Sequence, residues 1–293
     1  MKKILVVFIS ILILMPEVKS STTSASSYIL MDQNTGRVLL SKDKDSQRLI
    51  ASITKIMTCI LALESGKSED VVIVDDNATS AYGSGIYIEV GEEIKLKDLL
   101  YGLMLRSGND AASMIAAYVS GSIEEFVKLM NNKAKELGMK NTIFYTPSGL
   151  PTPHGNLSSV YDMAILTRYA MQNKEYREIV STKKYKTATN KKNYIWHNKN
   201  KLLKYDYITG GKTGYTEESG RTLVSTANID NMNLIVVTIR DSDDWNTHLE
   251  LYNYAKDNYI SYKVLNKNKF NLIGDTYYKR NTFYIKNDAV SYT

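Results

Sequence analysis

Ser52 and Lys55 are the first two side chains whose types and spacing could carry out chemistry. The apolar residues around them recur at the spacing of one helix face: Ile56, Cys59, Ile60 and Leu63. Residues three apart on a helix lie on the same side, so an amine would reach a hydroxyl. A serine nucleophile needs such an amine when no histidine is its base. By itself the pattern is equally typical of an N-capping serine before a solvated lysine.

Two further motifs follow in the chain. Ser107-Gly108-Asn109 alone is typical of a turn between two helices. Lys212-Thr213-Gly214 follows two glycines; a phosphate-binding loop ending there would need a glycine where Asp206 stands. Each motif has an ordinary structural reading when taken alone. In this order, however, the three motifs form a strong joint signal for serine acyl-transfer chemistry.

The three motifs together resemble the signature of the active-site-serine penicillin-binding proteins and serine β-lactamases. Four surrounding stretches narrow this to the low-molecular-mass penicillin-binding proteins that are D-alanyl-D-alanine carboxypeptidases: 51–58, 107–112, 158–164 and 210–227. The similarity covers about 27–259. It implies an α/β (α+β) fold in which a five-stranded antiparallel sheet, flanked by helices, lies beside an all-helical subdomain.

The resemblance implies a catalytic role for four residues. Ser52 would attack the carbonyl between two D-alanines, and its backbone N–H would form an oxyanion hole with that of Tyr215. Lys55 would accept the proton of Ser52. Ser107 would relay a proton to the leaving amine, and Asn109 would bind both the substrate amide and Lys55.

The substrate-binding residues would be Lys212, Thr213, Gly214 and Tyr215, with Lys212 and Thr213 holding the terminal carboxylate. To act as a base, Lys55 must be neutral, so its pKa must fall well below the usual ~10.4. Repulsion from Lys212, helped by burial, would lower it.

The family often has an arginine near position 199 that helps to bind the carboxylate. This chain has Lys199 there, and Arg240, at a strand end, is the alternative. No cofactor is expected. The histidines His154, His197 and His248 lack the spacing of a metal site, so a zinc peptidase is not expected either.

The elements that must position these residues come from both ends of the chain. Short β-like runs predict strands at 27–32 and 37–42, joined by the turn signal Asn34-Thr35-Gly36, and at 208–215, 222–227 and 234–239. Helical periodicity predicts helices at 95–106, 111–118, 123–137 and 159–171, with a closing helix over 245–259. This order indicates an antiparallel sheet assembled from both ends, with a helical insertion between them. The lysine-rich stretch 183–204 predicts exposed strands with a solvated face.

The N-terminus predicts export. Two lysines precede the apolar stretch 4–15, and Pro16 breaks it, which is typical of a signal peptide over 1–20 with cleavage after Ser20, or alternatively after Ala25. Twelve apolar residues are too few to span a bilayer comfortably. The mature protein is therefore expected to be secreted and extracytoplasmic, in the cell envelope, although the signal peptide could also stay as an anchor.

Composition agrees with this location. The formal net charge of +6 suits an anionic envelope, and no nucleic-acid motif is present. Cys59 is the single cysteine, so no intramolecular disulfide can form, and core packing is its expected role. We expect the catalytic domain over 27–260 and a short hairpin or tail over 261–293. That tail is too short for a further β-rich domain plus a membrane-docking helix, which leaves membrane association open.

The expected function is a serine carboxypeptidase that removes the terminal D-alanine from peptidoglycan stem peptides and is inhibited by β-lactams. A class A β-lactamase shares the three motifs but activates its deacylating water with a glutamate. This chain has no acidic residue between Phe144 and Tyr161. A non-catalytic penicillin-binding sensor or wall-binding module is the other alternative, although such a protein need not keep both lysines.

Overall fold

The computed structural model describes residues 23–79, 81–151, 154–265 and 289–292. The predicted signal peptide, 1–20, lies outside these residues. Within the described part, no helix is both long enough and apolar enough to cross a membrane.

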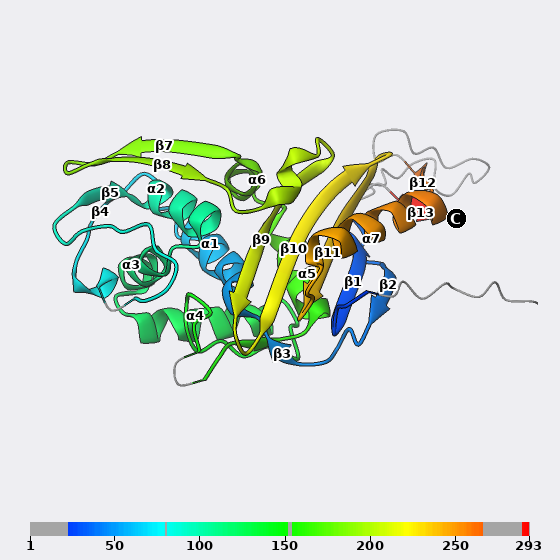
Figure 1. Cartoon of the computed structure of the whole chain (residues 1–293), viewed down its shortest axis with the longest axis horizontal. Helices are drawn as coiled ribbons and strands as arrows, with labels where there is room; N and C mark the ends of the chain where they lie inside the picture. The colour runs from blue at the N-terminus through cyan, green and yellow to red at the C-terminus, as the bar shows by residue number, and fades with distance from the viewer. Residues whose placement is uncertain (1–22, 80, 152–153, 266–288, 293) are drawn as a thin grey trace, which may run out of the picture.

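A five-stranded antiparallel sheet forms the centre of the molecule, in the order β2-β1-β11-β10-β9 (Figure 1). Its strands are β1 (Ser27–Asp32), β2 (Val38–Lys42), β9 (Ile208–Thr216), β10 (Gly220–Ile229) and β11 (Met232–Ile239). The first and last parts of the chain meet where β1 pairs with β11, with Ser27 opposite Ile239. The predicted fold class is confirmed, and β9 is an edge strand that borders the helical part.

The sheet is buried on both faces, and alternate residues of one strand enter different cores. In β1, Ile29 and Met31 belong to the larger core, whereas Tyr28 and Leu30 belong to the smaller one. The smaller core lies under α7 (Asp244–Asn258), and the larger one extends to α5 (Val160–Ala170) on the opposite face. This alternation follows from the two-residue period of a strand.

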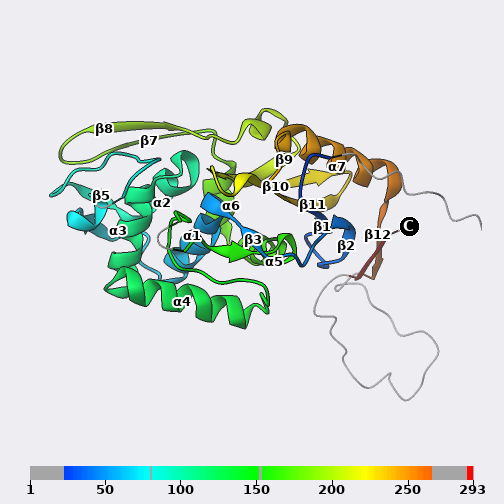
Figure 2. The ribbon, with the colours of Figure 1, turned by 60° about the horizontal axis from the view of Figure 1, so that its bottom comes forward.

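The larger core continues into the helical part. Its helices are α1 (Lys55–Glu64), α2 (Leu96–Tyr101), α3 (Asn109–Ser120), α4 (Ile123–Glu136) and α6 (Lys174–Ser181). Cys59 is fully buried in α1, which confirms its expected packing role. Figure 2 shows α4 and the long hairpin β7–β8 on opposite sides of this part.

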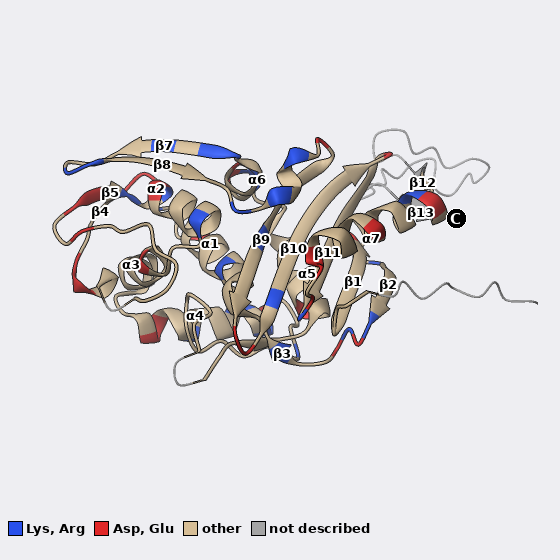
Figure 3. Ribbon diagram, viewed as in Figure 1, with Lys and Arg blue, Asp and Glu red and all other residues tan. Residues whose placement is uncertain are grey.

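The helical part also carries small sheets. They pair β4 (Val71–Ile73) with β5 (Glu93–Lys95), and β7 (Lys184–Ala188) with β8 (Asn193–His197). The hairpin β7–β8 is less exposed than predicted, because Tyr194 and Trp196 turn inward into the core while Lys184 and Lys186 stay outside. Figure 3 shows lysines along this edge of the molecule.

Two helical segments differ from the sequence prediction. The single helix expected over 95–106 is α2 followed by a π-helical turn, η3 (Gly102–Arg106), and Ser107 then ends it with a left-handed φ of 64°. Helix α6 was not predicted, because its eight residues give too short a periodic signal. Its start is capped by the side chain of Asn173, which accepts from the N–H of Tyr176 at 3.0 Å.

Short elements complete the described chain. β3 (Arg48–Leu49) pairs with β6 (Leu157–Ser158), and the 3₁₀ turns are η1 (Ala51–Thr54), η2 (Asp76–Ala78) and η4 (Lys201–Lys204). After α7, β12 (Ser261–Leu265) pairs antiparallel with β13 (Ala289–Tyr292). Because 266–288 lie outside the described residues, the predicted terminal hairpin or tail stays a prediction.

Candidate active site

Ser52 lies in the tight turn η1, directly before α1. Ala51 has a φ of 48°, which a non-glycine residue adopts only when its surroundings hold it there. The hydroxyl of Thr222 on β10 donates to the carbonyl of Ile50 at 3.0 Å and ties the turn to the sheet. The backbone that presents Ser52 is therefore held by its contact with β10.

Glycine at position 214 brings β9 close to this turn. A Cβ placed on Gly214 would lie 2.4 Å from Thr222 Oγ1 and 2.9 Å from the backbone nitrogen of Ser52. Any larger residue would push the strand away from the nucleophile. Ser52 and Tyr215, the two residues whose N–H groups are expected to form the oxyanion hole, flank this contact.

Lys55 is completely buried and has three polar neighbours. Its Nζ lies 3.1 Å from Ser52 Oγ, 2.8 Å from Asn109 Oδ1 and 2.6 Å from the carbonyl oxygen of Ser148. Two of these neighbours can only accept hydrogen bonds. A neutral amine would use its two N–H groups on them, and its lone pair would then face the hydroxyl of Ser52.

The amide of Asn109 is oriented by the segment that crosses the start of α3. Its Nδ2 donates to the carbonyl of Tyr82 at 2.6 Å, and its backbone N–H donates to the carbonyl of Ser84 at 2.8 Å. Because a carbonyl requires a donor, Nδ2 must face Tyr82 and Oδ1 must face Lys55. This orientation keeps Asn109 an acceptor toward the lysine.

Lys212 and Ser107 form the second half of the site. Lys212 is 2% exposed, and its Nζ donates to Ser107 Oγ at 3.1 Å and to the carbonyl of Thr213 at 2.6 Å. The left-handed backbone of Ser107 ends the π-helical turn and directs its hydroxyl to this lysine. The site thus contains two hydroxyl–amine pairs, one from η1 and α1, the other from η3 and β9.

Both buried lysines have lowered pKa values. Burial lowers the pKa of Lys55 well below its usual range; repulsion from Lys212 and Lys199 adds to this, and Asp110 opposes it. Burial also lowers the pKa of Lys212 to about 7, with a smaller contribution from Lys199. Desolvation is therefore the larger cause, whereas the sequence analysis put repulsion first.

A cleft of about 390 Å³ opens over these residues. Five of the eight predicted site residues line it: Ser52, Ser107, Thr213, Gly214 and Tyr215. The other three lie beneath: Lys55 contacts Ser52, Lys212 contacts Ser107, and Asn109 contacts Lys55. All eight therefore gather at one place, where β9 meets the helical part.

Lys199 also lines this cleft, and its Nζ donates to Ser84 Oγ at 3.1 Å. Arg240 instead lines a different cavity, with Glu218 and Ser219. A cation that the sequence analysis did not name, Arg221, lies in the wall of the cleft and pairs with Asp244 at 2.6 Å. Lys199 thus fits a carboxylate-binding role better than Arg240.

Two contacts that orient the site residues could not be predicted from side-chain types, because their acceptors are backbone carbonyls. The carbonyl of Ser148 accepts from Lys55, and the carbonyl of Tyr82 accepts from Asn109. The loop of Ser148 lies directly against η1, since a Cβ on Gly149 would meet the carbonyl oxygen of Ala51 at 2.0 Å. Asn156 fixes the loop by donating to the hydroxyl of Thr54 at 2.9 Å. Pro147, Gly149 and Pro151 are residue types that favour a loop, but they do not predict its place under the nucleophile.

The described residues contain no cluster of three or more histidine, cysteine, aspartate or glutamate side chains that could hold a metal ion. The site contains the buried amines of Lys55 and Lys212 and the hydroxyls of Ser52 and Ser107. The arrangement is that of serine acyl transfer with a lysine base.

A family model for D-alanyl-D-alanine carboxypeptidases matches residues 15–243. The chain is 42% identical over 220 residues to the D-alanyl-D-alanine carboxypeptidase DacF of Bacillus subtilis, an alignment that covers 73% of this chain and 56% of that protein. It is 32% identical to DacB2 of Mycobacterium tuberculosis, covering 69% of this chain and 70% of that one. The chain thus spans little more than half the length of DacF.

Solved structures agree with these matches. Penicillin binding protein 5 of Haemophilus influenzae superposes with a TM-score of 0.78 at 31% identity, covering 86% of this chain and 76% of that one. A mutant of the Streptomyces K15 DD-transpeptidase superposes with a TM-score of 0.76 at 28% identity, covering 81% of this chain and 100% of that one.

Proposed function

Because the chain belongs to the D-alanyl-D-alanine carboxypeptidase family, we propose that it removes the terminal D-alanine from peptidoglycan stem peptides through an acyl-enzyme on Ser52. The contacts of Lys55 carry this proposal. Two acceptors occupy its N–H groups, so that its lone pair is directed at the Ser52 hydroxyl. Burial lowers the pKa of this amine and so favours its neutral form, which is the state a general base requires.

In the first step, Ser52 Oγ bonds to the carbonyl carbon of the penultimate D-alanine while its proton passes to Lys55 Nζ. The N–H groups of Ser52 and Tyr215 stabilise the negative charge on the oxygen. The C–N bond then breaks, and the departing D-alanine amine takes up a proton by way of Ser107. Water hydrolyses the remaining ester, which releases the shortened peptide and restores the Ser52 hydroxyl.

The substrate enters along β9, the edge strand. An extended peptide can add to such an edge through main-chain hydrogen bonds. Its terminal carboxylate would then meet Thr213 and the positive charges of Lys212 and Lys199, which line or underlie the cleft. This placement puts the scissile bond beside Ser52.

β-Lactams should inhibit the enzyme, because their strained amide imitates the D-alanyl-D-alanine bond and acylates Ser52. The chain lacks an acidic residue between Phe144 and Tyr161 that could activate a deacylating water. Asn156 in this loop is already engaged: it donates to Thr54 and accepts the N–H of Tyr145 at 2.7 Å. Slow hydrolysis of the Ser52 ester, which releases the ring-opened penicillin, is the expected behaviour, and not rapid turnover.

Mass spectrometry after incubation with a stem pentapeptide and with penicillin tests the proposal. The expected result is a peptide shorter by one alanine and a stable adduct on Ser52. Rapid conversion of penicillin without an adduct would instead indicate a β-lactamase. Binding of either compound without chemistry would indicate the non-catalytic module.

We also propose that residues 1–20 act as a signal peptide, so that the enzyme works in the extracytoplasmic envelope. The cationic start, the apolar stretch and the location of the proposed substrate support this. N-terminal sequencing of the protein recovered from the envelope should begin at residue 21 or, for the alternative cleavage, at residue 26. An intact Met1 would show that the segment is retained.

A further inference from the structure

The segment 82–92 connects the active site to the tip of the hairpin β7–β8. At its inner end, the carbonyls of Tyr82 and Ser84 accept hydrogen bonds from the side chain and backbone of Asn109. Two glycines, Gly83 and Gly85, lie at this inner end, so its backbone has little stiffness of its own. Its position therefore depends on what holds it from outside.

Asp110 is the first of these external anchors. It is 6% exposed, and its carboxylate accepts the N–H of Ile86 at 3.0 Å and the N–H of Tyr87 at 2.7 Å. Asp110 directly follows Asn109 in α3. The segment is thus tied to the same helix turn that presents the active-site amide.

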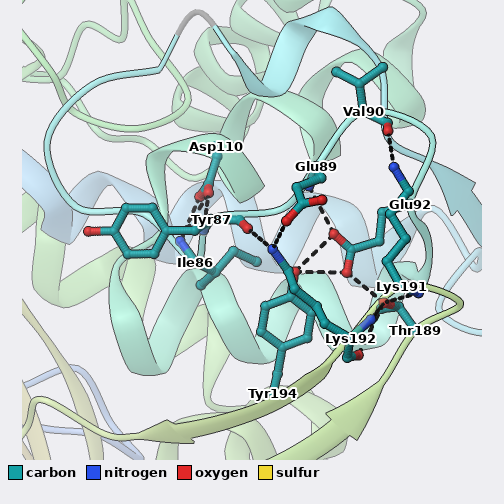
Figure 4. Close-up of polar contacts among 10 residues, drawn as sticks. All are labelled: Ile86, Tyr87, Glu89, Val90, Glu92, Asp110, Thr189, Lys191, Lys192 and Tyr194. Carbon is teal, nitrogen blue, oxygen red and sulfur yellow. Dashed lines mark hydrogen bonds and ion pairs between the residues drawn. The ribbon is translucent and has the colours of Figure 1, made fainter.

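The second anchor comes from the hairpin tip. Lys192 Nζ donates to the carbonyl of Tyr87 at 2.6 Å and to Glu89 Oε1 at 2.8 Å, and the neighbouring Lys191 donates to the carbonyl of Val90 at 2.5 Å. Figure 4 shows Lys192 reaching between the Tyr87 carbonyl and the Glu89 carboxylate.

Buried Glu92 completes this anchor. Its carboxylate accepts the hydroxyl of Thr189 at 2.6 Å and that of Tyr194 at 2.8 Å, both from the hairpin, and the N–H of Glu89 at 2.9 Å from the segment itself (Figure 4). The tip and the segment therefore share one hydrogen-bond network.

Tyr87 is the point where the two anchors meet. Its φ is 60°, a left-handed conformation that is costly for a residue with a bulky side chain. Its side chain is 74% exposed, so packing does not enforce this conformation. Instead, a carboxylate holds its N–H and an ammonium holds its carbonyl.

We propose that Lys192 is a positioning residue for acylation, acting through Tyr87 and the segment 82–87 on the amide of Asn109. This inference rests on the proposed function. Without Lys192, Tyr87 relaxes toward an ordinary φ, and the flexible stretch behind it shifts the carbonyl of Tyr82. The Asn109 amide can then rotate and point a donor at Lys55, whose lone pair is drawn away from Ser52.

The test compares Lys192→Met with wild type in the full chain, using a fluorescent penicillin and rapid mixing. Methionine keeps most of the length of the side chain but removes the ammonium group that donates. Since Lys192 is on the surface, the fold should persist. We expect the acylation rate constant to fall about three- to tenfold, with the pre-acylation dissociation constant little changed. Lys192→Arg, which can bind the same carbonyl, should restore most of the rate.

Lys186→Met is the matched control, because it removes the same charge from the exposed face of the same hairpin, away from the segment. It should acylate like wild type. Rates are expressed per active site, titrated with excess penicillin, so that unfolded protein does not count. An unchanged rate in Lys192→Met, an equal loss in Lys186→Met, or a change confined to thermal stability or to the dissociation constant would overturn the inference. Failure of the proposed function looks different, because wild type itself would then not be acylated.

Discussion

Two of the contacts between a serine hydroxyl and a basic nitrogen, Ser52 with Lys55 and Ser225 with His248, resemble each other in geometry but differ in what they can do. Ser52 Oγ lies 3.1 Å from Lys55 Nζ in the cleft. Ser225 Oγ lies closer, 2.6 Å, to the imidazole Nδ1 of His248 beneath α7. By distance alone, the second pair would be the better nucleophile and base.

The partners of each pair explain the difference. Ser225 Oγ is also bonded to the hydroxyl of Tyr252 at 2.7 Å, and the other imidazole nitrogen of His248 contacts Thr238 Oγ1 at 3.2 Å. All four side chains are fully buried between the sheet and α7. A substrate has no route to Ser225, and every polar atom of the cluster already has a partner.

Both bases are desolvated, but with different consequences. Burial lowers the pKa of His248 to about 3, so this imidazole is neutral at any physiological pH and serves as a packed polar residue. Burial and neighbouring cations lower the pKa of Lys55 and turn an amine that is ordinarily charged into a base. A lowered pKa therefore marks a catalytic group only when an open cleft and oxyanion donors accompany it.

The largest expected effect separates the two serines. Ser52→Ala should abolish labelling by fluorescent penicillin, because it removes the atom that forms the covalent bond. Ser225→Ala should keep the labelling rate within about twofold but lower the free energy of unfolding by about 1–3 kcal/mol, because two buried partners lose a hydrogen bond. Gel labelling and thermal unfolding measure both. Labelled Ser52→Ala, or unlabelled but folded Ser225→Ala, would reverse the comparison.

The next largest effect is on the acylation rate, and it tests whether Lys55 is the base. Lys55→Arg should slow acylation by about 10²–10⁴-fold, since a guanidinium stays protonated and cannot take the proton of Ser52. Lys212→Arg keeps the positive charge that orients a carboxylate, so weaker but measurable turnover is expected. Rate constants and affinities for both variants check this. Equal losses that arise through affinity alone would remove Lys55 from the role of base.

A smaller effect concerns stability and pH. His248 titrates at its ordinary value of 6.5 in the unfolded chain and at about 3 in the fold. Below pH 6.5 the unfolded state binds the extra proton, so stability should fall between pH 6.5 and 3, by up to about 4–5 kcal/mol from this group. Denaturant unfolding of His248→Gln and wild type measures the difference. Parallel pH profiles for the two proteins would show that His248 is not buried as a neutral base.

The smallest effect concerns the charge of Lys212. Acylation should rise with pH as Lys55 loses its proton and fall as Lys212, with a pKa of about 7, loses its own. In Lys212→Gln the acidic limb should move upward, because the repulsion that helps to lower the pKa of Lys55 is gone. Burial is a larger cause of the lowered Lys55 pKa than this repulsion, so the upward shift of the acidic limb should be small. A β-lactam of constant charge is the substrate of choice, and an unmoved limb would exclude this coupling.

Much of the fold and site could be predicted from the sequence. The predicted ranges of the five strands of the central sheet agree with the structure to within about two residues at each end, although β9 has few apolar residues. All eight predicted site residues meet at one cleft; three short motifs name seven of them by residue type, and the family resemblance added Tyr215. Helix α6 was missed because eight residues show too little periodicity.

Side-chain identity and local periodicity are what the sequence determined by itself, and they name Ser52, Lys55 and Lys212 as the groups that could react. The tertiary structure decided which state those groups are in. Burial of Lys55, and its contacts with Asn109 and the carbonyl of Ser148, depend on segments 54 and 93 residues away in the chain. Every residue has a backbone carbonyl, so no sequence pattern predicts which of them will contact Lys55. Only the folded chain places the carbonyl of Ser148 beside this lysine, where it can act as a base.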